Sequence, residues 1–273
     1  MRLIEKPRVT LIARPQLDAP GIHSYLERVG GLEWYNRVFV REARAKGEDL
    51  SVDPAAALVE FCGRLCYRSW DAGLNPNVTK VREDSAAYLR NILGSGHGSV
   101  MEHAQFSFIF EDVSRVFTHE QVRHRAGVAL SQESMRYVRL DNIPFWFPEW
   151  CRDDEEFMRR SLDLLEQMED HQRWMAEHFG LDDEGTDFTE KKAKTSFMRR
   201  FAPIGVGTGI VVSANIRAIR HMIEMRNSEH AEEEIQLLYR EVAALMIEEC
   251  PMLFGDYVQD SETGEYRTEF GKV

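Results

Sequence analysis

The chain has 273 residues and a formal net charge of −12, with 43% hydrophobic and 29% charged residues. This composition is ordinary for a globular protein and allows a core large enough for one big domain. A general nucleic-acid binder is disfavoured, because such proteins neutralise phosphates with many lysines and arginines. A local basic stretch in so acidic a chain points instead to a small anionic ligand.

No segment has the pattern of a targeting sequence or a membrane span. Charges and prolines interrupt residues 1–16 before any apolar run reaches signal-peptide length. No window approaches the roughly 18 apolar residues that a membrane helix needs. Cys62 and Cys66 lie one helical turn apart and Cys151 and Cys250 stand alone, which favours reduced structural thiols over a zinc site. We therefore expect a cytoplasmic protein without a bound metal.

The predicted elements are mostly helices, with a few short strands between them. This pattern, without an internal repeat or a linker, predicts a single α/β or α+β domain over residues 1–273. In chain order we expect a strand at 9–14, helices at 22–46, from 53 to about 70 and at 79–94, a strand at 104–114, a helix at 113–124, a long amphipathic helix at 155–180, a charged connection at 181–196, a strand at 207–215 and a second long amphipathic helix at 213–250.

Residues 123–137, RHRAGVALSQESMRY, hold three arginines, a histidine, two serines and a glutamine but only one acid. The apolar run from Gly127 to Leu130 separates the polar residues into two clusters, so we expect this stretch to be partly buried. A buried guanidinium needs a partner, and its planar shape suits phosphates and carboxylates. Ser134 has no evident base beside it, which favours a hydrogen bond to a ligand over nucleophilic attack.

Three other motifs do not fit the functions that they suggest. The glycine-rich segments 94–99 and 205–209 lack the GxGxxG spacing of a dinucleotide fingerprint, so a Rossmann domain is disfavoured. HEQVRH at 119–124 places its histidines at i and i+5, about 140° apart on a helix, and zinc catalysis is disfavoured as well.

HGSVMEH at 97–103 is more informative, because its glycine allows a close backbone approach and four polar side chains follow within seven residues. Two interpretations stay open here. The segment is a ligand-binding loop formed by His97, Ser99, Glu102 and His103, or it is a helix start in which Ser99 and Glu102 form a capping box.

The helix that begins near Asn215 is predicted to carry two polar stripes. At 100° per residue, Asn215, Arg226 and His230 point in similar directions, whereas Arg217, His221 and Glu224 lie on roughly the opposite side. This pattern indicates a helix between two polar sites or in a subunit interface. The alternative is a solvated helix with salt bridges, although lysine and glutamate would then be expected.

These motifs together resemble the flavin-dependent thymidylate synthases. The family signature is RHR, seven residues, then Ser followed by Arg-Tyr; here eight residues separate Arg125 from Ser134. We expect the extra residue to be absorbed by a bulge in a loop, because inside a helix it would rotate Ser134 by about 100°. Further matches between residues 55 and 255 are HGSVMEH, Arg199 four residues before Pro203, Asn215 with Arg217, Arg226 and His230, and EECP at 248–251.

The resemblance implies a mixed central β-sheet flanked by long helices, in a homotetramer whose active sites lie between subunits. It also implies a methyltransferase reaction that converts dUMP to dTMP. Methylenetetrahydrofolate would supply the carbon, NADPH would reduce FAD, and reduced flavin would supply the hydride, without a cysteine nucleophile. No nucleic-acid or membrane partner is expected.

The family's functional residues can be carried over to matching positions of this chain. Arg226 would be catalytic, because it would contact the uracil ring and favour ionisation at N3. Glu120 stands where relatives commonly have Gln, and His221 where some have Asn; whether Glu120 or Gln121 faces the nucleotide stays open. The residues implied for FAD are Ser99, Glu102, Arg123, His124, Arg125, Asn215, Arg217, His221 and His230. Those implied for dUMP are Glu120, Gln121, Arg123, Gln132, Ser134, Met135, Arg136, Arg226 and, on the phosphate, Arg199.

Two alternatives remain from the sequence. The chain could be a related flavin enzyme that transfers one carbon to another pyrimidine nucleotide, which the extra residue and Glu120 would suit. It could also be a non-catalytic flavin or nucleotide binder, although the presence of Arg226, Arg199 and Ser134 argues against a protein without turnover.

Overall fold

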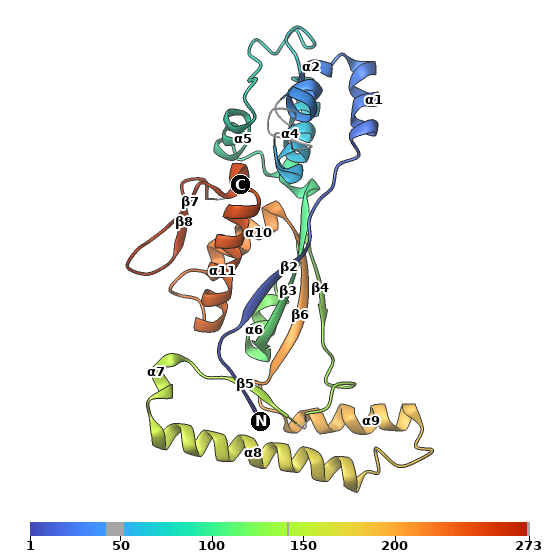
Figure 1. Cartoon of the computed structure of the whole chain (residues 1–273), viewed down its shortest axis with the longest axis vertical. Helices are drawn as coiled ribbons and strands as arrows, with labels where there is room; N and C mark the ends of the chain where they lie inside the picture. Colours follow the sequence, from blue (N-terminus) through green and yellow to red (C-terminus); the bar gives the residue numbers. More distant parts are fainter. Residues whose placement is uncertain (42–51, 141, 272–273) are drawn as a thin grey trace.

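The computed structural model describes residues 1–41, 52–140 and 142–271, which form a long, narrow molecule (Figure 1). One end consists of helices, the middle of a β-sheet with helices beside it, and the other end of two long helices that lie across the molecular axis. The first part contains α1 (Ala19–Val29), α2 (Leu32–Tyr35), the π-helical turn η1 (Asn36–Arg41), α4 (Pro54–Tyr67) and α5 (Ser85–Gly94).

The middle part is built on a four-stranded antiparallel sheet with the strand order β2-β3-β6-β4. Alternate side chains of β3, including Phe106, Phe108 and Phe110, are buried, as expected for a strand with one face in the core. The elements of this part are β2 (Arg8–Ala13), η2 (Gly98–His103), β3 (Gln105–Ser114), α6 (Arg115–Gln121), β4 (Val128–Gln132), β6 (Gly207–Asn215), α10 (Ile216–Arg226), α11 (Glu233–Glu249) and α12 (Pro251–Phe254).

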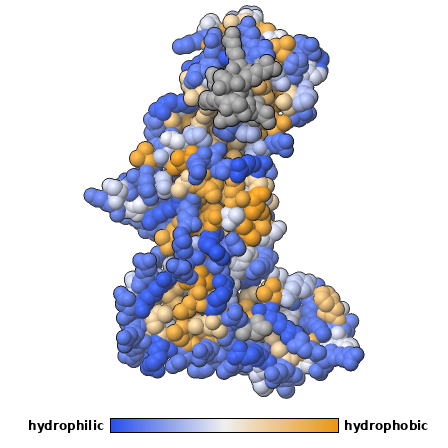
Figure 2. Space-filling model, in the orientation of Figure 1, coloured by the Kyte–Doolittle hydropathy of each residue, from blue (hydrophilic) through white to orange (hydrophobic). Residues whose placement is uncertain are grey.

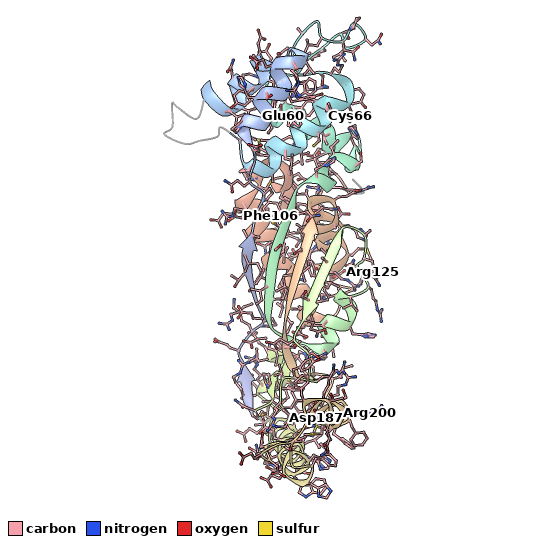
Figure 3. All side chains as sticks on the ribbon, turned by 90° about the vertical axis from the view of Figure 1, so that its right-hand side faces the viewer. Glu60, Cys66, Phe106, Arg125, Asp187 and Arg200 are labelled. Atoms are coloured by element: carbon pink, nitrogen blue, oxygen red, sulfur yellow. The ribbon has the colours of Figure 1, made fainter. Side chains whose placement is uncertain are left out.

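The main hydrophobic core runs continuously from the helical end into the layer between the sheet and α10 and α11. Figure 3 shows Phe106 on the sheet between the helical end and the basic residue Arg125. The other face of the sheet is less buried: Ser107 and Ser213 lie opposite each other, their hydroxyls 2.7 Å apart, and are half-buried. This second face therefore carries half-buried side chains of both kinds, the two serines and apolar residues such as Ile109 and Val211.

The last part is held to the sheet by the N-terminal segment. Strands β1 and β5 form a parallel pair, and the amino group of Met1 makes an ion pair of 2.8 Å with Glu169 of α8. Three small hydrophobic clusters stabilise this part separately from the main core. Its elements are β1 (Arg2–Ile4), β5 (Pro144–Trp146), α7 (Glu149–Arg152), α8 (Glu155–His178), α9 (Phe188–Met198) and the 3-10 turn η3 (Arg199–Phe201).

A C-terminal hairpin of β7 (Tyr257–Gln259) and β8 (Tyr266–Thr268) packs beside α10. Arg220 of α10 is 2% exposed and contacts both carboxylate oxygens of Asp256, at 2.8 and 2.7 Å. A bidentate pair of this kind satisfies a charge that would otherwise be costly to bury. Arg220 therefore fixes the hairpin on the helix.

The α/β class and the strands expected at 9–14, 104–114 and 207–215 are confirmed. The central sheet, however, is antiparallel throughout rather than mixed, and the parallel pairing among the described strands is between β1 and β5. Residues 128–132, read from the sequence only as an apolar run, form the edge strand β4.

Several predicted helices were wrong in their bounds. The helix at 22–46 is broken, because Gly30 adopts a left-handed conformation with φ 89° and ends α1; residues 42–46 lie outside the described residues. The helix at 79–94 starts only at Ser85, where Asp84 caps it, and that at 113–124 starts after its cap, Ser114, and ends at Gln121.

Two further corrections concern the second half of the chain. The charged connection at 181–196 contains α9, which Asp187 caps by accepting hydrogen bonds from two backbone N–H groups. The helix at 213–250 is two helices, since β6 continues to Asn215 and residues 227–232 separate α10 from α11.

The surface agrees with the acidic, polar composition. Hydrophobic side chains on the face in Figure 2 gather over the sheet in the middle part of the molecule and again in its lower part. No helix among the described residues is long and apolar enough to span a membrane. All four cysteines are free thiols.

A buried carboxyl group links α11 to the start of α6. Glu234 is 2% exposed and accepts hydrogen bonds from the backbone N–H and the hydroxyl of Ser114. Burial raises the pKa of Glu234 from 4.5 to about 7, although both hydrogen bonds from Ser114 lower it. The folded state thus holds this proton more tightly than the unfolded state does. The stability that the protonated Glu234 contributes is fully present below pH 4.5 and is lost as the pH rises through 7.

We expect Glu234→Gln to remove this pH dependence, because the amide cannot ionise. Between pH 4.5 and pH 8 the parent should lose up to roughly 3 kcal/mol of unfolding free energy relative to the variant. Chemical denaturation of both proteins at several pH values measures this difference. Glu233→Gln, at the neighbouring position, is the control. A constant difference across this range would contradict the assignment.

Candidate functional site

The ends of α6 and α10 and the RHR segment bring four predicted site residues together. Arg226, the last residue of α10, donates from its Nη1 to Glu120 at 2.5 Å and from its Nε to Nε2 of His124 at 2.9 Å. The ring of His221 lies edge-on to that of His124, with centroids 5.9 Å apart. We call Glu120, His124, His221 and Arg226 the His124 cluster.

Gln121 fixes the position of this cluster and does not belong to it. Its side chain is fully buried, accepts a hydrogen bond of 2.6 Å from the Tyr239 hydroxyl and contacts the sulfur of Met222. The question left open by the sequence is therefore answered for this structure: Glu120 faces Arg226, whereas Gln121 points into the core. This burial disfavours Gln121, and favours Glu120, as the residue that contacts the nucleotide.

The electrostatics of the cluster keep His124 neutral. Burial, and after it the positive charge of Arg226 and the neighbouring His221, together lower the pKa of His124 from 6.5 to about 4. A neutral imidazole can accept the hydrogen bond that Arg226 donates, with its proton on Nδ1. The cluster thus holds a fixed guanidinium between one carboxylate and one neutral acceptor, with 16% of the Arg226 side chain exposed.

The arginines on both sides of His124 are open to solvent. Arg123 and Arg125 are exposed, and their side chains make no hydrogen bond or ion pair with other described residues. The expectation that residues 123–137 are partly buried is confirmed for His124, Val128 and Ser134, which are half-buried, but not for these two arginines. The apolar residues after them pair with β6 at the sheet edge, which leaves the guanidinium groups free for an anionic ligand.

HGSVMEH forms the 3-10 turn η2 rather than a capped α-helix. His97 precedes it without a side-chain cap, so the capping box of Ser99 and Glu102 was wrong. Ser99 is exposed, and Glu102 makes an ion pair of 2.6 Å with Arg217 at the start of α10. Both predicted flavin residues of this turn are accessible beside α10.

Asn215 has a structural role that the sequence did not reveal. Its side chain caps α10 by accepting a hydrogen bond of 2.8 Å from the N–H of Ala218. Its own N–H donates to Gly127, which has φ 69°, and a Cβ at Gly127 would lie 2.3 Å from the Asn215 side chain. Asn215 and Gly127 thus join β6 to the turn before β4.

The predicted two-striped helix was wrong. Asn215 precedes the helix as its cap, and His230 lies beyond its end at Arg226, exposed in the turn before α11. Within α10 one face is buried, and Arg217 and His221 are exposed on the other. The helix is therefore amphipathic in the ordinary sense, with its site residues near its two ends.

A second group of arginines lies beyond the other end of β4. The Nε of Arg136 donates to the Ser196 hydroxyl at 2.9 Å, and the Nε of Arg199 donates to the Ser196 carbonyl at 3.2 Å. Ser134 is half-buried, and its hydroxyl accepts a weak bond of 3.4 Å from the N–H of Arg136. We call Ser134, Arg136, Ser196 and Arg199, together with Arg115, the Ser134 cluster.

Arg115 was missed by the sequence analysis. It donates to the carbonyl of Glu133 at 2.8 Å, while its Nε is buried without a hydrogen-bond partner. Burial lowers the pKa of Arg115, and the nearby charge of Arg199 lowers it further. An anion beside Arg115 and Arg199 would stabilise the charged form of both guanidinium groups and so offset the burial and the mutual repulsion. The available signal was its place as the first residue after the β3 strand.

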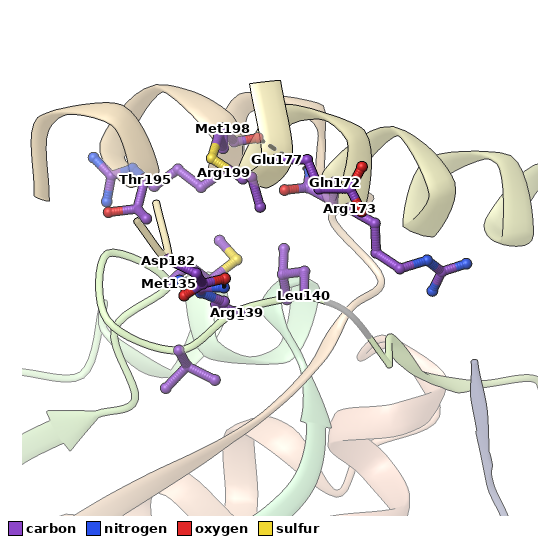
Figure 4. A pocket seen from close by; sticks show the side chains of 12 residues that line it. Met135, Arg139, Leu140, Gln172, Arg173, Glu177, Asp182, Thr195, Met198 and Arg199 are labelled. Carbon is purple, nitrogen blue, oxygen red and sulfur yellow. Dashed lines mark hydrogen bonds and ion pairs between the residues drawn. The ribbon is translucent and has the colours of Figure 1, made fainter. Parts of the chain in front are cut away.

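The remaining predicted dUMP residues have different surroundings. Gln132 donates to the Thr118 hydroxyl at 2.9 Å, which links β4 to α6. Met135 and Arg199 line a cavity of about 180 Å³ between α8, α9 and the segment after Ser134 (Figure 4). Met198 lines this cavity from the side of α9 and Leu140 from the opposite side, and Arg199 belongs to both the cavity lining and the Ser134 cluster.

The two clusters are separated along β4. The strand pairs with β6 from Val128 to Gln132 in an unbroken register, so no bulge inside it absorbs the extra residue of the motif. Four residue steps of a strand span about 13 Å, and each cluster lies beyond an end of this segment. A single chain therefore presents two basic clusters rather than one closed site.

Comparison with known proteins identifies the family. Residues 50–252 match the family of the thymidylate synthase complementing protein, Thy1. The chain belongs to this family. The matched residues include both clusters of the Thy1 chain, along with η2, β3, β6 and α10.

Relatives and solved structures agree with this assignment. The flavin-dependent thymidylate synthase of Mycolicibacterium gilvum is 34% identical over 261 residues, covering 92% of this Thy1 chain and 89% of that protein. That of Mycobacterium tuberculosis is 36% identical over 208 residues, covering 75% and 80%. The UMP/dUMP methylase PolB of Streptomyces cacaoi, bound with 5-Br UMP, shares the fold with a TM-score of 0.61 at 17% identity, over 93% of this chain and 95% of that one.

No group of three histidine, cysteine or acidic side chains in the described ranges could hold a metal ion. The donors suit a dinucleotide instead: exposed arginines for a pyrophosphate, and an exposed hydroxyl and histidine for a ring system. The observation that carries this fit is the pair of unpartnered guanidinium groups at Arg123 and Arg125 beside the neutral His124.

We expect Arg226→Gln to raise the pKa of His124 from about 4 toward 6.5, because a repelling positive charge is removed while burial remains. The measurement is a pH titration of the histidine ring signals by NMR, with His124→Gln identifying the signal. Arg14→Gln is the control, because it removes one positive charge from a different ion pair, the one between Arg14 and Glu249. An unchanged His124 titration in Arg226→Gln would show that the two side chains do not interact in solution.

Proposed function

We propose that this chain is a flavin-dependent thymidylate synthase, a methyltransferase that converts dUMP to dTMP. Methylenetetrahydrofolate donates the carbon, and NADPH delivers reducing equivalents through FAD. The observation that carries the proposal is the His124 cluster, in which a fixed guanidinium lies beside exposed arginines. Family membership and the curated relatives support the same reaction.

The flavin site is assigned to residues around η2, the RHR motif and α10. Arg123 and Arg125 would bind the pyrophosphate, because they are exposed and unpartnered within the described chain. His124 would contact the ring system, with Ser99 and His221 as further polar contacts. Glu102 and Arg217 already form an ion pair, so they would orient each other at the edge of this site. FAD supplies the hydride chemistry when bound.

The nucleotide site is assigned to both clusters. Arg199, with Arg136 and Arg115, would neutralise the phosphate of dUMP, and Ser134 would donate a hydrogen bond to it. Arg226 would contact the uracil ring and stabilise the negative charge that develops there. Glu120 accepts a hydrogen bond from the Arg226 guanidinium and holds it in place, so the uracil ring would have to share this guanidinium with Glu120.

Because one chain separates the clusters, we assign each active site to two subunits of a homotetramer. One subunit would contribute the His124 cluster and another the Ser134 cluster. The half-buried second face of the sheet and the hydrophobic surface of the middle part support association there (Figure 2). A cytoplasmic location suits the proposed nucleotide substrates.

The function is tested by the visible spectrum of the purified protein and by product analysis. We expect a flavin spectrum, NADPH oxidation that dUMP accelerates, and dTMP from the complete substrate mixture. Product from UMP or dCMP but not from dUMP would indicate the related one-carbon enzyme. Tight dUMP binding without any product would indicate a nucleotide-binding protein and would overturn the proposal.

The shared site is tested with mixed oligomers. Arg226→Ala and Arg199→Ala should each nearly abolish turnover when they are produced alone. If the two arginines of one site come from different subunits, co-expression should restore about a quarter of the parent activity, since random mixing pairs intact residues in that fraction of sites. Arg200→Ala, the exposed neighbour whose guanidinium lies over Phe197, should be nearly fully active.

The controls separate shared sites from failure to assemble. Sedimentation should show the same oligomer for the parent, each variant and the mixture, and the Arg226→Ala protein should retain its flavin. Co-expressed protein with no activity above that of the separate variants would place both arginines of each site in one chain.

A further inference from the structure

A second cavity lies in the helical end of the molecule, away from the two basic clusters. It has a volume of about 480 Å³ and is lined by residues of α4, of α5 and of the segment that connects them. These elements lie in the helical end of the molecule (Figure 1). This volume falls in the usual range for small-molecule sites. Polar groups that face it come from Tyr67, Lys80, Arg82, Tyr88, Asn91 and His97.

The charge of this cavity is opposite to that of the chain. Its described lining contains lysine, arginine and histidine side chains but no aspartate or glutamate, in a protein with a net charge of −12. The side chains of Lys80 and Arg82 make no hydrogen bond or ion pair with a described residue. Two free cations that line one concave surface favour an anion with more than one charge.

The third cation of the cavity is already neutralised. Arg64 is fully buried, pairs with Glu60 at 2.7 Å and donates to the carbonyls of Ser69 and Arg82 at 2.7 and 2.6 Å. These bonds hold the connecting segment on α4, so the backbone of Arg82 has a fixed position at the cavity wall. The guanidinium of Arg64 lies 4.2 Å from the ring centroid of Tyr88, which forms another part of the cavity wall.

The cavity adjoins the proposed flavin site through His97. This residue lines the cavity and directly precedes η2, which carries Ser99 and Glu102. The exposed ring of Tyr67 lies edge-on to that of His97, with centroids 6.1 Å apart. A ligand whose ring system reaches the flavin could therefore extend a charged arm past His97 toward Lys80 and Arg82.

We propose that this cavity binds the anionic arm of a co-substrate that reacts at the flavin, with Lys80 and Arg82 as its charge partners. The proposal rests on the proposed function, which supplies two co-substrates with such an arm. The phosphates of NADPH and the glutamyl carboxylates of the folate share the required chemistry, a chain of several negative charges. Asn91 and Tyr67 offer further hydrogen bonds at the cavity wall.

The test compares Lys80→Gln, Arg82→Gln and the double variant with the parent protein. Calorimetric titrations with NADP⁺, with a monoglutamyl folate and with a pentaglutamyl folate measure each affinity directly, without turnover. Arg90→Gln is the matched control, because it removes one positive charge from α5 outside the cavity, where Arg90 pairs with Glu269.

We expect the double variant to bind one anionic arm at least about tenfold more weakly, with a smaller dependence of affinity on salt. Weaker binding of NADP⁺ alone would assign the cavity to the phosphates. Weaker binding of pentaglutamyl but not monoglutamyl folate would assign it to the glutamyl chain. The flavin spectrum and the affinity for dUMP should stay unchanged, as should every affinity in Arg90→Gln.

Unchanged affinities for all three ligands in a folded double variant would overturn the proposal. A fall in melting temperature without a change in affinity would do the same, because it would mean that both cations serve the stability of the fold rather than a ligand. A colourless protein that forms no dTMP would contradict the proposed function, whereas the titrations would still report on the cavity itself.

Discussion

The antiparallel pairing of β3 with β6 determines where the candidate site lies. Gln105 pairs with Asn215 and Ser114 with Gly207, so the two strands end at opposite ends of the sheet. Each strand continues directly into a capped helix, α6 after Ser114 and α10 after Asn215. Both helices run back over the same face, and their last turns meet. The contact between Arg226 and the pair Glu120 and His124 is a consequence of this arrangement.

The same packing explains how a charged group is kept in a defined state at the end of a short helix. Gln121 anchors α6 through Tyr239, and Arg220 anchors α10 through Asp256. Since both helices are fixed from the core side, the polar ends need no further support and can present a neutral imidazole and a guanidinium to a ligand. An arginine that already has one carboxylate partner keeps its orientation before substrate arrives, which lowers the ordering cost of binding.

Motif spacing predicted the family and most of the residues that gather in the two clusters, because a ligand site constrains residue type at fixed intervals. The alternation of β3 likewise predicted a strand. What could not be predicted was the role of residues whose neighbours come from distant segments. Gln121 and Asn215 are polar and adjacent to site residues, yet one is buried against Met222 and the other caps a helix. Arg115 shows the reverse error, since only the fold brings it close to Arg199.

The edge strand β4 connects these local arrangements to the assembly. It is short and regular, and it carries the RHR motif at one end and the Ser134 motif at the other, so its length keeps the two clusters apart within a chain. A nucleotide needs one site for its phosphate and one for its ring. The length of β4 places the two clusters of one chain too far apart to serve as this pair of sites. In the proposed oligomer, pairing the clusters of neighbouring chains would remove this conflict, and catalysis would then depend on association as well as on folding.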